Sequence, residues 1–171
     1  MKKYRIINIA LIFVFTSGFI SCTGGYSFTG ADISADIKTF SVDYFENRAP
    51  LVQPTLSNVF TEALKDRFLS QTSLDLVNTD GHLNFDGQIT NYRVSPQAFT
   101  GDETAALNRL TITINVRFTN TKDPSKNFER SFSRYADFES TVSLNAVEND
   151  LISEIVDQIT EDIFIQSVAN W

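Results

Sequence analysis

The stretch from Arg109 to Asn120 constrains the fold most strongly, because its side chains alternate without a break. One set of positions is apolar and the intervening set is charged or polar: Leu110, Ile112, Ile114, Val116 and Phe118 against Arg109, Thr111, Thr113, Asn115 and Arg117. Successive side chains of a β-strand point to opposite faces of its sheet. The pattern therefore predicts a strand with one buried face and one wet face, in a sheet that another layer covers on one side.

Two segments have the periodicity of amphipathic helices. The first follows Pro54, which suits the first helical position because its missing N–H would be unpaired there. Its apolar stripe is predicted to form core, with polar residues such as Arg67 on the other side: Leu56, Val59, Phe60, Ala63, Leu64 and Phe68. The second opens with Asn145 and Glu148, which resemble a capping pair. Its inward residues are Val147, Leu151, Ile152, Ile155, Val156, Ile159 and Ile163.

The remaining segments predict further strands. Residues 33–45 alternate with a change of parity near Lys38, which indicates a bulge or two short strands. Asp80-Gly81 lies between two apolar runs, so a two-residue hairpin turn is expected to pair residues 73–79 with 82–94 antiparallel. Residues 127–138 form a last strand. The longer loop from Ser95 to Leu107 is the expected contact loop.

This order of elements predicts an α+β fold. We expect a two-layer sandwich with two helices packed on one face of a mixed, mostly antiparallel sheet of four to five strands. The first strand–helix–strand unit should be parallel if its two strands are neighbours.

The first 22 residues resemble a bacterial lipoprotein signal. Lys2, Lys3 and Arg5 precede an apolar run of about 15 residues, shorter than the roughly 20 needed to span a bilayer. The only cysteine, Cys22, ends the segment. Residues 1–21 are therefore expected to be a signal peptide, 22–30 a lipidated tether at Cys22, and 31–171 a single domain. An ordinary secreted protein with an accidental thiol is the alternative.

Charge and residue inventory exclude several functions. Removing three of the 14 basic residues with the signal leaves 11 against 21 acidic ones, a formal charge of −10 that argues against nucleic acid as a partner. The only histidine is His82, beside the expected turn, and neither histidine nor cysteine is numerous enough for a metal site. We expect no enzyme activity, no catalytic residues and no cofactor.

Basic residues gather in the last two predicted strands. They are Arg109, Arg117, Lys122, Lys126, Arg130 and Arg134, and no lysine or arginine follows them. Arg109, Arg117, Arg130 and Arg134 could meet at one sheet edge, where forked guanidiniums suit phosphate. The alternative, equally favoured, is that they pair with the acidic last helix.

The chain resembles the LptE family of lipopolysaccharide-assembly lipoproteins, in its Bacteroidetes-type form. The residues that carry the resemblance span most of the chain after Cys22: Gly25-Tyr26-Ser27-Phe28-Thr29-Gly30, Pro54-Thr55-Leu56-Ser57, Phe60-Thr61-Glu62-Ala63-Leu64, Gln71-Thr72-Ser73-Leu74, Asn108-Arg109-Leu110-Thr111-Ile112, Glu161-Asp162-Ile163-Phe164 and Asn170-Trp171.

The resemblance implies a non-enzymatic protein anchored on the periplasmic side of the outer membrane. It implies a heterodimer in which this chain is the single plug of an LptD-type outer-membrane β-barrel, helps that barrel assemble, and contacts lipopolysaccharide. The four arginines are then candidate contacts for lipopolysaccharide phosphates, a role assigned from local charge. A periplasm-facing adaptor in another envelope complex is the alternative function.

Overall fold

The structure, a computed structural model, describes residues 33–97 and 106–168. Six strands form one sheet in the order β3-β1-β4-β5-β6, and β2 also pairs with β4. The strands are β1 (Thr39–Val42), β2 (Glu46–Asn47), β3 (Asp75–Leu76), β4 (Leu83–Gln97), β5 (Leu107–Asn120) and β6 (Phe128–Glu139). The helices are α2 (Leu56–Gln71) and α3 (Leu144–Val168), with a short 3-10 turn, η1 (Pro124–Lys126), before β6.

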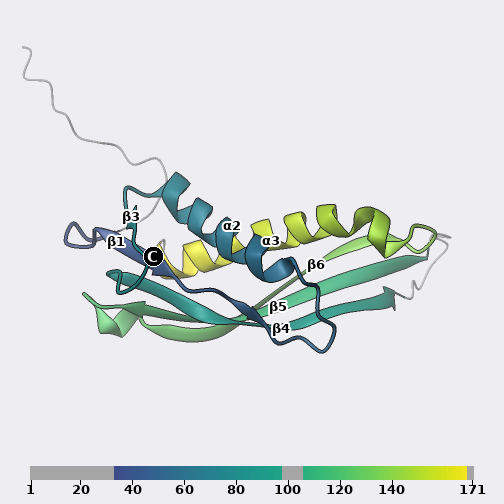
Figure 1. Ribbon diagram of the computed structural model, residues 1–171, viewed down its shortest axis with the longest axis horizontal. Coiled ribbons are helices and arrows are strands. Elements are labelled where there is room, and N and C mark those ends of the chain that lie inside the picture. Colours follow the sequence, from purple (N-terminus) through teal and green to yellow (C-terminus); the bar gives the residue numbers. More distant parts are fainter. Residues whose placement is uncertain (1–32, 98–105, 169–171) are drawn as a thin grey trace, which may run out of the picture.

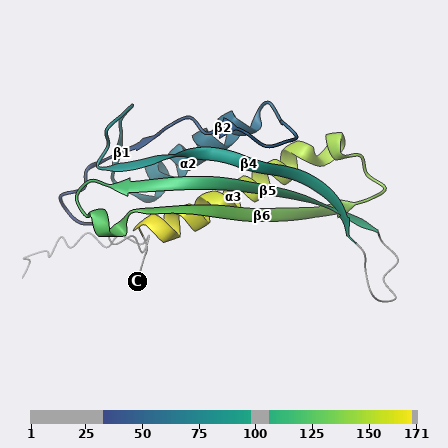
Figure 2. The same cartoon turned by 90° about the horizontal axis from the view of Figure 1, so that it is seen from below.

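Both helices cover the same face of this sheet. In Figure 1 they lie side by side above the strands, and in Figure 2 the strands β4, β5 and β6 lie in front of them with their other face open. This arrangement confirms the predicted α+β two-layer fold. The sheet has six strands where four to five are expected, because residues 33–45 form only β1, and the chain just after them adds a second short strand, β2, that also pairs with β4.

The three long strands have the pairing that their alternation predicts. β4 and β6 both run antiparallel to β5, and Ile114 lies between Ile89 and Phe132 on the helix-covered face. The register of β4 shifts between Ile89 and Asn91. This bulge changes the parity of the buried positions along β4, since Leu83, Phe85 and Ile89 precede it while Tyr92 follows it, and all four are buried.

The predicted hairpin at Asp80-Gly81 is wrong. β3 does not pair with β4; β1 lies between them and pairs in parallel with each. Asp80 does adopt a positive φ of 56°, but Gly81 packs against the chain of β1, where an added Cβ would lie 2.6 Å from the backbone carbonyl carbon of Phe40. The predicted parallel strand–helix–strand unit, β1–α2–β3, is confirmed. Its first strand, β1, occupies the place beside β4 that the hairpin prediction gave to β3.

Both helix starts differ from prediction by one or two residues. Pro54 precedes the first residue of α2, Leu56, and Thr55 stands at the N-cap position. Asn145 is the second residue of α3, so it does not cap the helix. Glu148 instead accepts a 2.5 Å hydrogen bond from the hydroxyl of Tyr92, tying α3 to β4. Burial first, and then this hydrogen bond, raise the pKa of Tyr92.

Phenylalanine rings link the two layers into one core. Phe68 of α2 lies 5.4 Å from Phe40, 4.7 Å from Phe85 and 5.2 Å from Phe164, measured between ring centroids. The series continues along the sheet from Phe85 to Phe118. The inward residues predicted for α3 are buried, except that Val147 is only partly so. These rings and aliphatic side chains account for the stability of a domain without disulfides.

Within the described residues, neither helix combines the length and apolar character needed to cross a membrane. The predicted loop from Ser95 to Leu107 is shorter than expected, because β4 continues to Gln97 and β5 begins at Leu107. The rest of that loop, Cys22, the tether and the terminal Asn170-Trp171 lie outside the described residues.

Candidate functional site

The four candidate arginines do not gather on one surface. In β5, Arg109 and Arg117 are opposite Asp137 and Glu129 of β6 in the register, on the open face of the sheet. Arg130 and Arg134 have the other parity: they are opposite Val116 and Ile112, on the helix-covered face. β5 and β6 are neighbouring strands, but successive side chains of a strand point to opposite faces. Two of the four arginines therefore lie on each face of the sheet.

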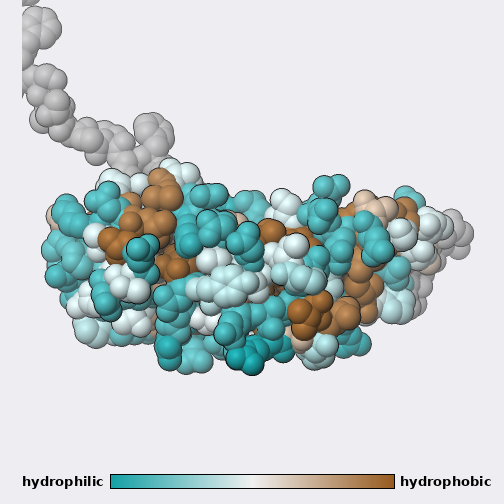
Figure 3. Space-filling model, viewed as in Figure 1, coloured by the Kyte–Doolittle hydropathy of each residue, from teal (hydrophilic) through white to brown (hydrophobic). Residues whose placement is uncertain are grey.

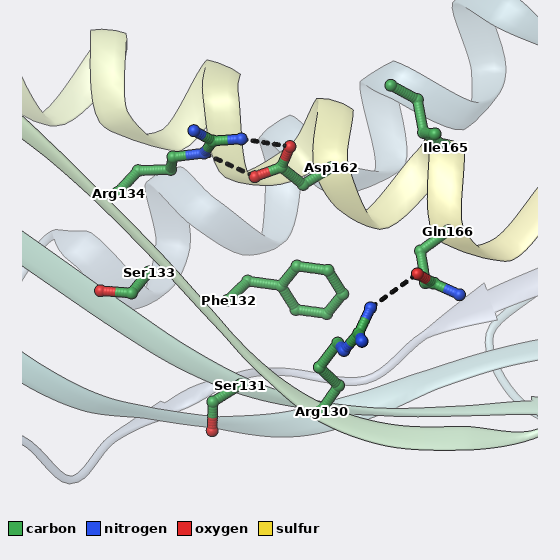
Figure 4. A pocket seen from close by; sticks show the side chains of 8 residues that line it. All are labelled: Arg130, Ser131, Phe132, Ser133, Arg134, Asp162, Ile165 and Gln166. Atoms are coloured by element: carbon green, nitrogen blue, oxygen red, sulfur yellow. Dashed lines mark hydrogen bonds and ion pairs between the residues drawn. The ribbon is translucent and has the colours of Figure 1, made fainter.

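Arg130 and Arg134 line a groove between the edge strand β6 and the C-terminal half of α3 (Figure 4). Arg134 donates from Nε and Nη2 to the two carboxylate oxygens of Asp162, both at 2.6 Å. Hydrogen bonding to Asp162 raises the pKa of Arg134. This ion pair joins β6 to α3. For Arg134, the alternative prediction of a salt bridge to the acidic last helix is therefore confirmed.

Arg130 differs from the other three arginines in its partner. Its Nη1 donates to the neutral amide oxygen of Gln166 at 2.7 Å, and among the described residues it forms no ion pair. In Figure 4, Phe132 lies between the two arginines and points toward α3, while the hydroxyls of Ser131 and Ser133 point away from it. Arg130 is therefore the member of the set whose charge is not balanced by a neighbouring carboxylate.

The two arginines of the open face are each held by an aspartate. Arg109 donates to both carboxylate oxygens of Asp137 at 2.7 Å, and its guanidinium carbon lies 3.6 Å from the ring centroid of Tyr135. The Arg109 hydrogen bonds lower the pKa of Asp137. Arg117 forms a similar pair with Asp86, which raises its pKa.

The centre of the open face is polar but uncharged. Side chains with hydroxyl or amide groups occupy neighbouring positions of β4, β5 and β6: Gln88, Asn91, Thr113, Asn115, Ser131 and Ser133. The hydroxyls of Thr113 and Ser133 lie 2.9 Å apart. Such a surface can form many hydrogen bonds to water or to a polar partner without a strong charge preference.

Arg67 does not lie where the sequence predicts. The periodicity of α2 places it on the side opposite the apolar stripe, but its side chain is only 15% exposed and lies between α2 and α3. It donates to Glu161 at 2.7 Å and also binds the carboxylate and backbone carbonyl of Asp157. The sequence pattern predicts the acidic face of α3, but it does not predict that α2 packs against this face.

His82 has a structural role. Its Nδ1 accepts a hydrogen bond from the backbone N–H of Lys38 at 3.0 Å, and its carbonyl accepts from the backbone N–H of Thr121. These contacts join the ends of β1, β4 and β5. Across residues 33–97 and 106–168, no three His, Cys, Asp or Glu side chains are grouped as metal ligands.

The family is decided by a match that covers almost the whole described body. Residues 37–167 match the family model described as "LptE: Lipopolysaccharide-assembly". The chain belongs to the LptE family. The match begins just before β1 and ends within α3, so it includes every strand of the sheet. LptE proteins are non-enzymatic lipoproteins of the outer membrane that act in lipopolysaccharide assembly.

Solved structures of very different sequence share the fold. A minor lipoprotein from Acinetobacter baumannii is 15% identical with a TM-score of 0.51, and the match covers 76% of this chain and 91% of that one. A hypothetical protein from Chlamydia trachomatis is 11% identical with a TM-score of 0.54, covering 78% of this chain and 99% of that one. No curated protein sequence matches significantly.

Proposed function

We propose that this LptE protein is an outer-membrane lipoprotein that plugs an LptD-type β-barrel and assists lipopolysaccharide transport to the cell surface. The observation that carries the proposal is the family match over residues 37–167, which spans both helices and the complete sheet. The partner is a single barrel, in a heterodimer with one plug per barrel, and the cargo is lipopolysaccharide.

The open face of the sheet supports a position inside a barrel. The lumen of an outer-membrane barrel is polar and wet. The hydroxyl and amide side chains at the centre of β4, β5 and β6 suit such surroundings, because they can hydrogen-bond to the wall and to water alike. The helices on the other face pack on the core that stabilises this sheet.

Cys22 is proposed to be the anchor. Residues 1–21 would be removed as a signal peptide, and residues 22–30 would link the acylated cysteine to the single domain at 31–171. One acyl chain binds membranes marginally, whereas two or three hold a domain stably. The anchor would keep the domain on the periplasmic side of the outer membrane, where the barrel is assembled.

Phosphate groups of lipopolysaccharide are proposed to contact Arg109, Arg117, Arg130 and Arg134. Arg130 is the first choice, because its partner Gln166 is neutral and a phosphate would not have to displace a carboxylate. The other three would exchange Asp137, Asp86 or Asp162 for the phosphate. Arg130→Gln should therefore weaken lipopolysaccharide binding more than Arg109→Gln, measured with the purified chain. Unchanged binding in a variant with all four arginines neutralised would exclude these contacts.

Recovery of the partner tests the function. The full-length tagged chain, purified from detergent-solubilised membranes, should bring with it a β-barrel protein of several hundred residues in a 1:1 ratio. Recovery of other envelope proteins without a barrel would contradict the plug and favour the adaptor alternative. In cells that lack the barrel, Cys22→Ala should leave the fold intact but shift the chain out of the outer-membrane fraction. Continued outer-membrane fractionation of Cys22→Ala in cells that lack the barrel would contradict the anchor.

A further inference from the structure

The loop between β2 and α2 exposes a compact apolar tip. Pro50, Leu51 and Val52 are consecutive and exposed, with Leu51 at 56% and Val52 at 58%. In the space-filling view, hydrophobic side chains form a patch at the lower right, where Figure 1 shows this loop. Single exposed apolar residues are ordinary, but adjacent ones on a projecting loop are a feature of binding surfaces.

Hydrogen bonds at its base hold this tip in place. The side chain of Asn47 spans the loop: Nδ2 donates to the carbonyl of Gln53 at 3.1 Å, and Oδ1 accepts from the N–H of Ala49 at 3.0 Å. The side-chain oxygen of Gln53 accepts from the N–H groups of Thr55 and Leu56 at the start of α2. A tip fixed in this way loses little conformational entropy when it enters a pocket.

An acidic hollow lies on the open face of the sheet beside β2, the strand that precedes the tip. It is lined by Asp43, Glu46, Asp86 and Glu129, together with Tyr44 and Arg117. Arg117 is bound to Asp86, and Glu46 is bound to Arg48. The remaining carboxylates, on Asp43 and Glu129, give the hollow a negative charge, and Tyr44 is 60% exposed beside them. Residues 43–52 thus join the hollow to the tip in one continuous stretch.

We infer that the tip and the acidic hollow form the docking surface for a protein partner, which presents an aliphatic socket with a basic rim. The inference rests on the proposed function, in which that partner is the β-barrel. Protein interfaces combine a buried apolar anchor with a charged rim, and complementary charge speeds association. A lipid surface fits these observations less well, because Arg48, the basic residue nearest the tip in the sequence, is paired with Glu46 and the chain is strongly acidic.

The test compares two double variants of the full-length chain. Leu51→Ser with Val52→Ser removes the tip, whereas Val59→Ser with Leu69→Ser removes two exposed apolar side chains, at 37% and 47%, from helix α2. Barrel recovered from solubilised membranes should fall roughly tenfold or more for the tip variant, because burial of each aliphatic side chain changes an equilibrium by about that factor. The helix variant should recover as much barrel as wild type.

Further arms separate the possible outcomes. Asp43→Asn with Glu129→Gln should lower recovery and make it less sensitive to salt, since the rim charges would be gone. If wild type recovers no barrel, the proposed function is wrong, and the docking surface that rests on it is overturned with it. If wild type recovers a barrel and the tip variant recovers equally well, the docking surface is wrong. Tip-dependent binding of the purified chain to phosphatidylcholine vesicles, with unchanged barrel recovery, would overturn the inference in favour of a lipid surface.

Discussion

The two faces of strands β4, β5 and β6 differ in composition and in role: one is buried under the helices and the other is open. On the covered face, Leu110, Ile112 and Ile114 of β5 are fully buried beneath the helices. On the open face, the intervening positions carry arginines, threonines and an asparagine that meet polar side chains of β4 and β6. The alternation of side chains along β5 therefore determines both the buried surface and the open surface of the sheet. Because burial drives stability and the open face buries little, its residues are free to suit a partner without loss of the fold.

The largest effect is expected at the centre of the covered face. Phe68→Ala should destabilise the domain by about 3–5 kcal/mol, because it removes a ring that packs on three others and leaves a cavity. Urea unfolding followed by circular dichroism measures the change. The next residue, Leu69, is 47% exposed and provides the control. Leu69→Ala should cost less than about 1 kcal/mol. Equal losses for the two variants would show that the ring cluster beneath α2 contributes no more to stability than an exposed side chain of the same helix.

Sequence periodicity predicted this contrast because it depends on local spacing. The alternation in β5 and the stripes of α2 and α3 place the core residues of these elements correctly, except that Val59 is 37% exposed and Ala63 and Val147 are only partly buried. A period of two or 3.6 fixes which side chains share a face. The pairing of β3 could not be read in the same way. Asp80-Gly81 favours a hairpin locally, but β1, some 40 residues earlier in the chain, fills the position beside β4 and outcompetes the local partner.

The candidate site was less predictable for a related reason. The basic composition of β5 and β6 was evident, but the pairing of each guanidinium depends on which face and which helix it meets. Parity alone could have separated Arg109 and Arg117 from Arg130 and Arg134. The partners Asp162 and Gln166, and the placement of Arg67 between the helices, depend on how α3 lies on the sheet. Sequence spacing within one element carries no such information.

Gly87 provides a second way to test the boundary between the faces. Its φ of 155° disfavours other residues, and an added Cβ would lie 2.1 Å from the carbonyl oxygen of Asn115 and 2.8 Å from the ring of Phe45. Gly87→Ala should therefore cost about 1–3 kcal/mol through strain and displacement of that ring. Its neighbour Gln88 is exposed on the open face, so Gln88→Ala should unfold at nearly the wild-type urea concentration. A neutral Gly87→Ala would show that both the Asn115 carbonyl and the Phe45 ring can move aside without cost.

Arg67 tests how far charge contributes on the helix side. Arg67→Met keeps much of the side-chain volume but removes the contacts to Asp157 and Glu161 that join α2 to α3. We expect a loss of about 1–2 kcal/mol, reduced from the value for a buried pair because both carboxylates are partly exposed. Lys65→Met, which removes the pair with Glu62 within one helix, should change the unfolding midpoint much less. If the two variants unfold together, the contact between the helices has no special weight.

The smallest effect is expected for the ion pair on the open face, and it should appear only as a dependence on pH. Hydrogen bonds from Arg109 lower the pKa of Asp137 below its usual value. The folded protein therefore binds this proton less readily than the unfolded chain. The pair's stabilising contribution is complete above the unfolded pKa of about 4 and is lost as the pH falls through the lower folded pKa. Asp137→Asn should thus reduce stability slightly at pH 6, and the difference from wild type should shrink toward pH 3. Urea unfolding across this range measures the difference.

In an Arg109→Gln background, Asp137→Asn should produce no such pH-dependent difference, because the group that lowers the pKa of Asp137 is absent. If the pH dependence persists there, the pair is not its source, and the open face contributes to stability through contacts other than this one.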